Sequence, residues 1–321
     1  MILVTGHAGF IGYHLVKKLL FLGHEVVGLD NLNDYYDVSL KRSRLARLEG
    51  LAADIRMDLE DGEGVKRVFA QFRPEVVIHL AAQAGVRYSL AHPDQVMRAN
   101  VMGMLHVLEA CRAYPPKHLL FASSSSVYGD QGGLPYRVTD RTDAPVSPYA
   151  ASKKAGEVMA HTYAHLYGIP STGLRFFTVY GPMGRPDMAP HLFATAMMAH
   201  RPIALFNHGK MARDFTYVDD VVESVVRLLE HPPSLLGNKV PFSLYNVGRG
   251  EPVSLLTFVQ LLEEALGQKA QITFYPMQPG DVKKTWAEVE RLRKTIDFVP
   301  EVSLAEGISR FASWFLEYYH G

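Results

Sequence analysis

Tyr149 and Lys153, in the segment SPYAASK, are the pair of residues in this sequence best suited to proton transfer. On an α-helix, a spacing of four residues places both side chains on one face, one turn apart. A free phenol has a pKa of about 10 and is a poor base at neutral pH, but a nearby ammonium favours the phenolate and lowers that pKa. The pair therefore predicts a proton acceptor for an alcohol substrate. The same spacing also occurs on ordinary amphipathic helices, so the prediction depends on the elements around the pair.

Ser124 is the expected hydroxyl donor to the substrate oxygen that Tyr149 deprotonates. It lies in a run of four serines, residues 123–126, directly after a strand predicted at His118–Ala122. Serine clusters also form turns, and the residues alone leave open which of the four makes the contact.

The N-terminal segment has the pattern of a dinucleotide-binding turn. A short apolar strand is predicted at Ile2–Thr5, followed by GHAGFIG with Gly6, Gly9 and Gly12 and by the helical pattern YHLVKKLLFLG. Backbone N–H groups and the positive end of a helix in such a turn bind a pyrophosphate. The spacing G-x-x-G-x-x-G differs from the commoner G-x-G-x-x-G, but the physical requirements are the same. The alternative is a turn whose glycines only cap a helix, and we rank it well below nucleotide binding.

Asp30, at the end of a strand predicted at His24–Leu29, indicates which dinucleotide is bound. A carboxylate there accepts hydrogen bonds from the adenosine ribose and would repel a 2′-phosphate, which predicts NAD rather than NADP. A third strand, Ala53–Met57, runs into Asp58 and Leu59, within reach of the adenine. The oxidised nicotinamide of this cofactor would add positive charge near Tyr149 and lower its pKa further.

Strands alternate with helices through the first half of the chain. This rhythm predicts the fold class α/β, with a Rossmann-like doubly wound parallel sheet. Such sheets bind ligands at the carboxyl ends of their strands, where the residues described above lie. Further strands are predicted at Val76–Leu80 and Ser171–Phe176, and helices at Gly64–Phe72, Gln95–Ala113 and Ser147–Tyr167.

The sequence after Phe176 predicts a smaller α/β substrate domain. We expect an NAD-binding domain over residues 1–176 and the substrate domain over 177–321, with segments near 214–250 as candidates for a return to the first domain. The segment TVYGPMGRPDMAP is rich in Pro and Gly and predicts a loop near the active site. Later elements are predicted at His191–Arg201, Ile203–Phe206, Leu244–Val247, Leu255–Leu266, Gln271–Tyr275 and Leu304–Tyr319.

The segment NHGKMARDFTYVDDV is predicted to be a basic loop that enters a helix near Val218. Its Arg213 suits bidentate binding of a phosphate. A structural ion pair between Arg213 and Asp214 or Asp219 is the alternative that the sequence leaves open.

The composition excludes several classes of partner. Lys+Arg and Asp+Glu both number 33, so no overall charge favours nucleic acid or a membrane surface. No apolar run approaches the length of a membrane span. Cys111 is the single cysteine, which excludes an intrachain disulfide and predicts a cytoplasmic protein. No metal site is predicted.

Taken together, these residues resemble an extended short-chain dehydrogenase/reductase that acts on nucleotide sugars. Five longer segments are similar to UDP-glucuronate 4-epimerases: DNLNDYYDVSLKRSRL, AAQAGVRYS, FFTVYGPMGRPDMA, GKMARDFTYVDD and MQPGDV. The resemblance implies reversible C4 epimerisation of UDP-glucuronate to UDP-galacturonate through a 4-keto intermediate, with tightly bound NAD. It also implies a homodimer formed by the helices at Gln95–Ala113 and Ser147–Tyr167.

The resemblance implies site residues at matching positions of this chain. Arg185 would hold the uronate carboxylate, and Ser126 keeps a hydroxyl where relatives often have threonine. The implied NAD contacts are Gly6, Gly9, Phe10, Ile11, Gly12, Asp30, Asn31, Asn33, Asp58, Leu59, Ala81, Ala82, Gln83, Tyr149, Lys153 and Phe176. The implied substrate contacts are Arg87, Ser124, Ser126, Tyr149, Thr178, Arg185 and Arg213, with Tyr149, Lys153 and Ser124 as the catalytic residues.

Four other functions compete with this interpretation. A UDP-glucuronate decarboxylase shares the first oxidation, but the GRPDM loop argues against it. A sugar 4,6-dehydratase needs an Asp–Glu pair just after Ser124, where this chain has serines. A UDP-galactose epimerase for neutral sugars should not need Arg185. A catalytically inactive NAD-binding regulator would not need an intact Tyr149 and Lys153.

Overall fold

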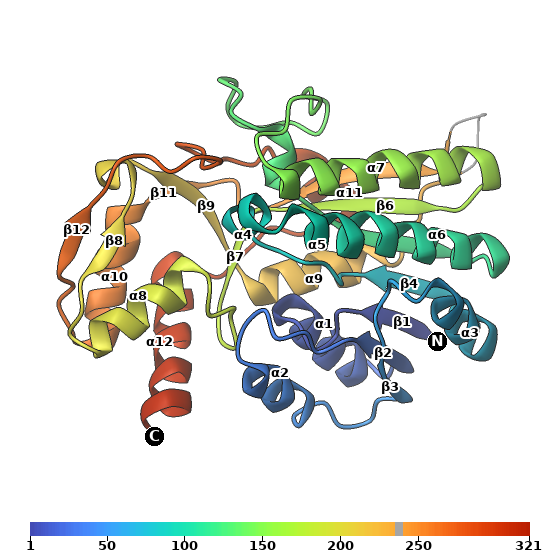
Figure 1. Ribbon diagram of the computed structural model, residues 1–321, viewed down its shortest axis with the longest axis horizontal. Helices are drawn as coiled ribbons and strands as arrows, with labels where there is room; N and C mark the ends of the chain where they lie inside the picture. Colours follow the sequence, from blue (N-terminus) through green and yellow to red (C-terminus); the bar gives the residue numbers. More distant parts are fainter. Residues whose placement is uncertain (235–239) are drawn as a thin grey trace.

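A seven-stranded parallel sheet organises the computed structural model, which describes residues 1–234 and 240–321 (Figure 1). Its central strands are apolar and fully buried, as expected for parallel strands covered on both faces. In spatial order the strands are β10 (Phe242–Val247), β6 (Ser171–Phe176), β5 (His118–Ser124), β4 (Val76–His79), β1 (Ile2–Thr5), β2 (Val26–Asp30) and β3 (Ala53–Arg56). The predicted doubly wound sheet is confirmed.

Helices cover both faces of this sheet and produce two cores. On one face α1 (Phe10–Phe21) packs against α9 (Val218–Leu228). On the other face α3 (Gly62–Phe72) packs against α6 (Gly103–Ala113), and α6 packs against α7 (Pro148–Tyr167). In Figure 1, α6 and α7 run side by side in the upper part of the view, and α1 and α9 lie below them.

The remaining elements form a smaller lobe beside the carboxyl edge of the sheet (Figure 1). One small sheet has the order β11 (Pro252–Ser254), β9 (Ala212–Tyr217), β7 (Thr178–Tyr180), and the other pairs β12 (Ile272–Phe274) with β8 (Ile203–Leu205). The helices of this lobe are α8 (Ala189–Met198), α10 (Leu255–Leu266) and α12 (Leu304–His320). β10 lies in the large sheet although it follows residue 176, and the predicted domain boundary stays a prediction.

Two segments predicted as loops contain strands instead. Thr178–Tyr180 forms β7 and Ala212–Tyr217 forms β9, and the two pair in parallel with Thr178 opposite Phe215. These short runs of aromatic and β-branched residues were not recognised as strands, because glycine, proline and charged residues surround them in the sequence. The predicted helix at 95–113 is also divided, because a π-helical turn at Arg98–Met102 separates α5 (Pro93–Met97) from α6.

Several short elements were not predicted. They are α2 (Val38–Leu45), α4 (Val86–Ala91), α11 (Glu290–Ile296), the strand β11 and the 3₁₀ turns at Ser125–Tyr128 and Asn207–Gly209. None of the helices within residues 1–234 and 240–321 has both the length and the apolarity needed to cross a membrane.

A buried ion pair connects α7 to the sheet beneath the serine run. Arg175 on β6 donates to both carboxylate oxygens of Glu157, at 2.7 and 2.8 Å, and both side chains are almost fully buried. Ser123 donates to the same carboxylate at 2.7 Å. Arg175 also donates to the hydroxyl of Tyr128 at 2.9 Å. The network therefore fixes α7, β5 and β6 relative to one another.

Glu157→Ala should lower the free energy of unfolding by about 3–5 kcal/mol, because the Arg175 guanidinium would remain buried without a counter-charge. Denaturant unfolding followed by circular dichroism measures this change. Glu75→Ala, which removes the exposed Glu75–Lys117 pair, is the control and should leave the unfolding midpoint nearly unchanged. Equal effects of the two substitutions would contradict the assigned importance of the buried pair.

Candidate active site

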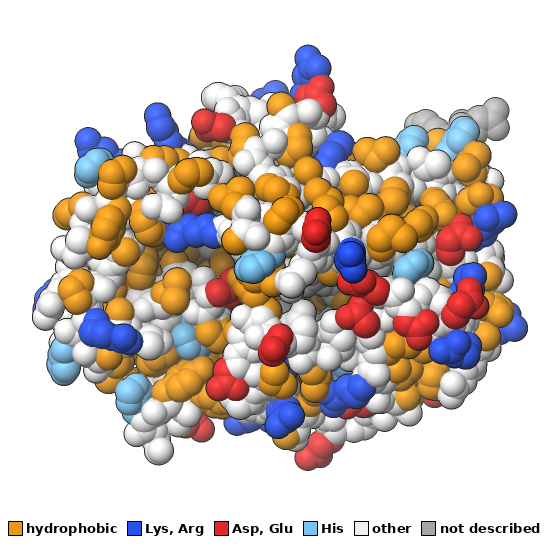
Figure 2. Space-filling model, viewed as in Figure 1, with side chains coloured by type: hydrophobic (Ala, Val, Ile, Leu, Met, Phe, Trp, Pro, Cys, Tyr) orange, Lys and Arg blue, Asp and Glu red, His pale blue; other side chains and the backbone are white. Residues whose placement is uncertain are grey.

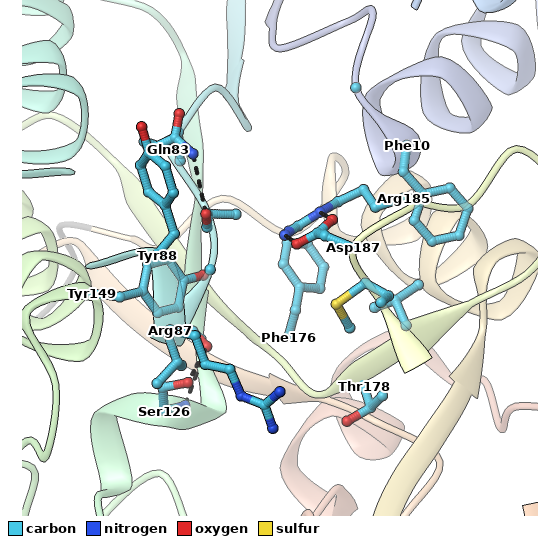
Figure 3. A pocket seen from close by; sticks show the side chains of 18 of the residues that line it. Phe10, Gln83, Arg87, Tyr88, Ser126, Tyr149, Phe176, Thr178, Arg185 and Asp187 are labelled. Carbon is cyan, nitrogen blue, oxygen red and sulfur yellow. Dashed lines mark hydrogen bonds and ion pairs between the residues drawn. The ribbon is translucent and has the colours of Figure 1, made fainter. Parts of the chain in front are cut away.

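A cavity of about 1000 Å³ lies between the carboxyl edge of the large sheet and the smaller lobe. Every residue that was predicted to contact the cofactor or the substrate lines this cavity. Side chains from distant parts of the chain face one another across it: Figure 3 shows Tyr149, Arg87 and Ser126 on one side and Arg185 and Asp187 on the other.

The glycine turn gives the cavity the shape of a dinucleotide site. A Cβ at Gly12 would lie 2.0 Å from the Gly6 carbonyl oxygen, and Gly6 itself has a φ of +75°. Only glycine allows helix and strand to approach this closely. No side chain caps the start of α1, so N–H groups of its first turn are available to a pyrophosphate. These residues fit the predicted NAD.

Asp30 is fixed beside this turn. Its carboxylate accepts hydrogen bonds from the backbone N–H of Ala8 at 3.2 Å and of Leu32 at 2.8 Å. The side chain is only slightly exposed and lines the cavity, where it can accept a ribose hydroxyl. A further hydrogen bond, from Asn31 to Asp58 at 2.7 Å, connects the segments that follow β2 and β3. The acceptors therefore lie where the adenosine of NAD is expected.

Tyr149 and Lys153 project from the first turns of α7 into the cavity. The Ser147 side chain accepts a hydrogen bond from Ala150 N–H at 3.1 Å and defines the start of this helix. Lys153 donates to the Ala122 carbonyl oxygen at 3.0 Å. Burial lowers the pKa of the Lys153 ammonium to about 8.

Lys153 and a bound nicotinamide were expected to lower the pKa of Tyr149, and that expectation stays a prediction. Burial raises the pKa of the phenol, whereas the charge of Arg185 and the hydroxyl of Ser124 act in the opposite direction. Desolvation therefore outweighs the nearby charges. The cation that lowers the pKa of Tyr149 most is Arg185. From the sequence, Arg185 was expected only to bind the substrate.

The serine run separates into two roles. Ser123 donates to Glu157 and is thereby tied to the buried network below the cavity. Ser124 donates to the Ser126 hydroxyl at 3.1 Å and accepts from the Ser126 N–H at 3.2 Å. Because Ser124 is close enough to Tyr149 to lower its pKa, the geometry favours Ser124 as the hydroxyl donor.

Arg185 forms an ion pair on the opposite side of the cavity. Its Nε and Nη2 donate to the two carboxylate oxygens of Asp187 at 3.0 and 2.5 Å. The Tyr35 hydroxyl donates to the same carboxylate at 2.9 Å. Thr178 lies at the start of β7, where Figure 3 shows it near this end of the cavity. The guanidinium is therefore already bidentate to a protein carboxylate.

Arg87 and Arg213 place two further cations in the cavity. Arg87 pairs with Asp281 at 3.0 Å and stacks over the Phe206 ring at 4.4 Å. Arg213 donates to the carbonyl oxygens of Ala212 and Lys283, at 2.9 and 3.3 Å.

The alternative ion pairs of Arg213 are absent from the part of the chain that the structure describes. Asp214 accepts from backbone N–H groups, including that of Arg249 at 2.9 Å, and Asp219 pairs with Arg310 at 3.5 Å. Arg213 therefore stays available to an anionic ligand.

Several cavity residues were not predicted as site residues. Lys41 is buried and donates to the Asn33 carbonyl and side-chain oxygens at 2.8 and 2.7 Å, which fixes the loop after β2. The only sequence feature that could have pointed to Lys41 as a site residue is its place within the segment DNLNDYYDVSLKRSRL. The others with polar or aromatic side chains include Tyr35, Tyr36, Tyr88, Asp187, Phe206, Asp281 and Thr285.

Comparisons with known proteins agree with this geometry. A probable UDP-glucuronate 4-epimerase of Rhizobium meliloti is 48% identical over 99% of this chain and 97% of its own length. A crystal structure of UDP-glucuronic acid 4-epimerase from Bacillus cereus, in complex with UDP-glucuronic acid and NAD, is 34% identical with a TM-score of 0.90, over 99% of both chains. A UDP-glucose 4-epimerase from Thermotoga maritima, solved with UDP-glucose, is 31% identical with a TM-score of 0.88, again over 99% of both chains. Residues 2–248 match the NAD dependent epimerase/dehydratase family, and the chain belongs to that family.

Proposed function

We propose that the protein is a UDP-glucuronate 4-epimerase that keeps NAD bound through the catalytic cycle. The observation that carries the proposal is the position of Arg185 in the same cavity as Tyr149, Lys153 and Ser124. Relatives that match this chain over nearly its full length have the same activity in their names. The reaction converts UDP-glucuronate to UDP-galacturonate and is reversible.

Tyr149 removes the proton of the C4 hydroxyl, and Ser124 donates a hydrogen bond to the same oxygen. Bound NAD supplies the site that takes up the C4 hydride and returns it. Lys153 donates a hydrogen bond to the Ala122 carbonyl oxygen, which holds its ammonium group on the same face of α7 as Tyr149. The resulting 4-keto sugar turns in the cavity, so that the hydride returns to its other face.

The carboxylate of the substrate makes this reaction prone to a side reaction. A 4-keto uronic acid is a β-keto acid, and it loses carbon dioxide when the C–carboxylate bond aligns with the carbonyl π system. A charge-assisted contact from Arg185 holds the carboxylate out of that alignment. The same contact favours uronates over neutral hexoses.

The nearest alternatives are a UDP-glucuronate decarboxylase and an epimerase of neutral UDP-hexoses. The fold alone does not separate them, because the structure of a UDP-glucose 4-epimerase is nearly as similar as that of the uronate enzyme. Arg185, which lines the cavity opposite Tyr149, favours a uronate substrate. An NAD-binding regulator without activity does not account for the intact Tyr149 and Lys153.

Tyr149→Phe should reduce epimerisation by a factor of about 10²–10⁴, because only the proton acceptor is removed. NAD should remain bound at the wild-type stoichiometry, which is measured by extracting and quantifying the nucleotide. Product formation from UDP-glucuronate is followed by chromatography. Substantial activity of this variant would contradict the role given to Tyr149.

Arg185→Ala should weaken the apparent affinity for UDP-glucuronate by about one to two orders of magnitude, because a charge-assisted contact contributes about 1.5–3 kcal/mol. A fraction of turnovers should also release UDP-pentose and carbon dioxide, since the carboxylate can then rotate. Activity with UDP-glucose is the comparison. If both substrates lose activity equally and no pentose appears, Arg185 only braces its loop through Asp187.

A homodimer is proposed for the assembly. It is supported by apolar side chains that gather over α6 and α7 in Figure 2. Exposed apolar residues of α5, the π-helical turn and α7 include Met97, Met102, Val158, Leu166 and Tyr167. Light scattering at micromolar concentration should give twice the mass of one chain. Val158→Glu with Leu166→Glu should give monomers, and wild-type protein that is already monomeric would contradict the proposal.

A further inference from the structure

The ion pair of Arg185 occupies one edge of its guanidinium. Nε and Nη2 both donate to Asp187, and the guanidinium also interacts with the Tyr35 hydroxyl, but Nη1 donates to no carboxylate or carbonyl oxygen among residues 1–234 and 240–321. The two side chains are about one-quarter exposed, at 22% and 27%, so the pair is shielded but faces the cavity. A substrate carboxylate can therefore meet Arg185 through Nη1 while Asp187 stays in place.

Tyr35, in the loop between β2 and α2, also contacts this pair. Its hydroxyl donates to the Asp187 carboxylate at 2.9 Å, and the Arg185 guanidinium lies 5.9 Å from its ring centre. The Tyr35 ring packs edge to face against Tyr88 with centroids 4.8 Å apart. A Cβ at Gly85 would lie 2.7 Å from the Tyr35 hydroxyl, so the hydroxyl lies close to the Gly85 backbone.

The protonation states suit this arrangement at neutral pH. Burial raises the pKa of Asp187, but Arg185 and the Tyr35 hydroxyl outweigh burial and hold that pKa below its usual value. Burial and the Asp187 charge raise the pKa of Tyr35 to about 12. Tyr35 is therefore a neutral donor, Asp187 is an anion, and the hydrogen bonds between the three residues persist through the physiological range.

We propose that Asp187 and Tyr35 are positioning residues that hold Arg185 so that its Nη1 edge receives the carboxylate of the substrate. The inference rests on the proposed function and adds to it the reason why a single arginine can select uronates. A guanidinium that is fixed before binding loses little conformational freedom when the substrate arrives. A free arginine in a loop rich in glycine and proline would lose more.

Binding measured without turnover tests this inference. In a Tyr149→Phe background, calorimetry compares the dissociation constants of UDP-glucuronate and of UDP, which lacks the sugar carboxylate. Adding Asp187→Asn should weaken UDP-glucuronate about tenfold and leave UDP unchanged, since the amide cannot accept both Arg185 bonds. Adding Tyr35→Phe removes one hydrogen bond and should weaken UDP-glucuronate about threefold.

Asp143→Asn is the matched control. Asp143 pairs with Arg141 at 2.6 Å with the same spacing of two residues, but this pair is exposed and lies outside the cavity. It should change neither dissociation constant. Thermal melting and extracted NAD are measured for each variant, because an intact fold and a full complement of cofactor are expected throughout.

A double-mutant cycle separates positioning from a direct effect of Asp187. In the presence of Arg185→Ala, Asp187→Asn should cause no further loss of UDP-glucuronate affinity, because Asp187 acts through Arg185. An unchanged or tighter affinity in the single Asp187→Asn variant would overturn the inference, and so would a loss that persists without Arg185. If the Tyr149→Phe background binds UDP-glucuronate no tighter than UDP, the proposed substrate fails, and this inference fails with it.

Discussion

The contact of one face of α7 with the carboxyl ends of β5 and β6 is the constraint on which the site depends. Three α7 residues, spaced four apart, meet this edge. Tyr149 lies beside Ser124, Lys153 donates to Ala122, and Glu157 binds both Ser123 and Arg175. The deepest of these contacts is a buried ion pair, and the outermost forms the reactive end of the cavity. The register of the helix therefore sets the geometry of the proton acceptor.

The opposite side of the cavity depends on a second ion pair of different character. Arg175 and Glu157 are almost fully buried and act on the fold, whereas Arg185 and Asp187 are partly exposed to the cavity. Because Arg185 is partly exposed, its positive charge and its N–H donors can still act on a ligand in the cavity. The same charge acts on Tyr149 across the cavity and partly offsets the desolvation of its phenol. Under the role proposed for Arg185, substrate selection and the acidity of Tyr149 are coupled through one arginine.

Sequence patterns predicted the parts of the molecule that have strong periodicity or a steric requirement. Strand and helix alternation predicted the parallel sheet, and the spacing of Gly6, Gly9 and Gly12 predicted the turn. β7 and β9 were missed because each is short and lies in a segment rich in turn-forming or charged residues. The effect of burial on the pKa of Tyr149 was not predicted, because burial cannot be deduced from the spacing of a Tyr–Lys pair. The Tyr35 contact with Asp187 joins residues 152 positions apart and left no local signal.

The central claim is that one bound NAD takes the C4 hydride of UDP-glucuronate and returns it to the same sugar. Purified protein, without added NAD, should be incubated with UDP-glucuronate that carries deuterium at C4, and both sugars should be examined by mass spectrometry and NMR. The account predicts UDP-galacturonate that keeps the deuterium at C4, with no label lost to solvent. UDP-galacturonate with hydrogen at C4, or the absence of UDP-galacturonate from wild-type protein that contains NAD, would contradict it.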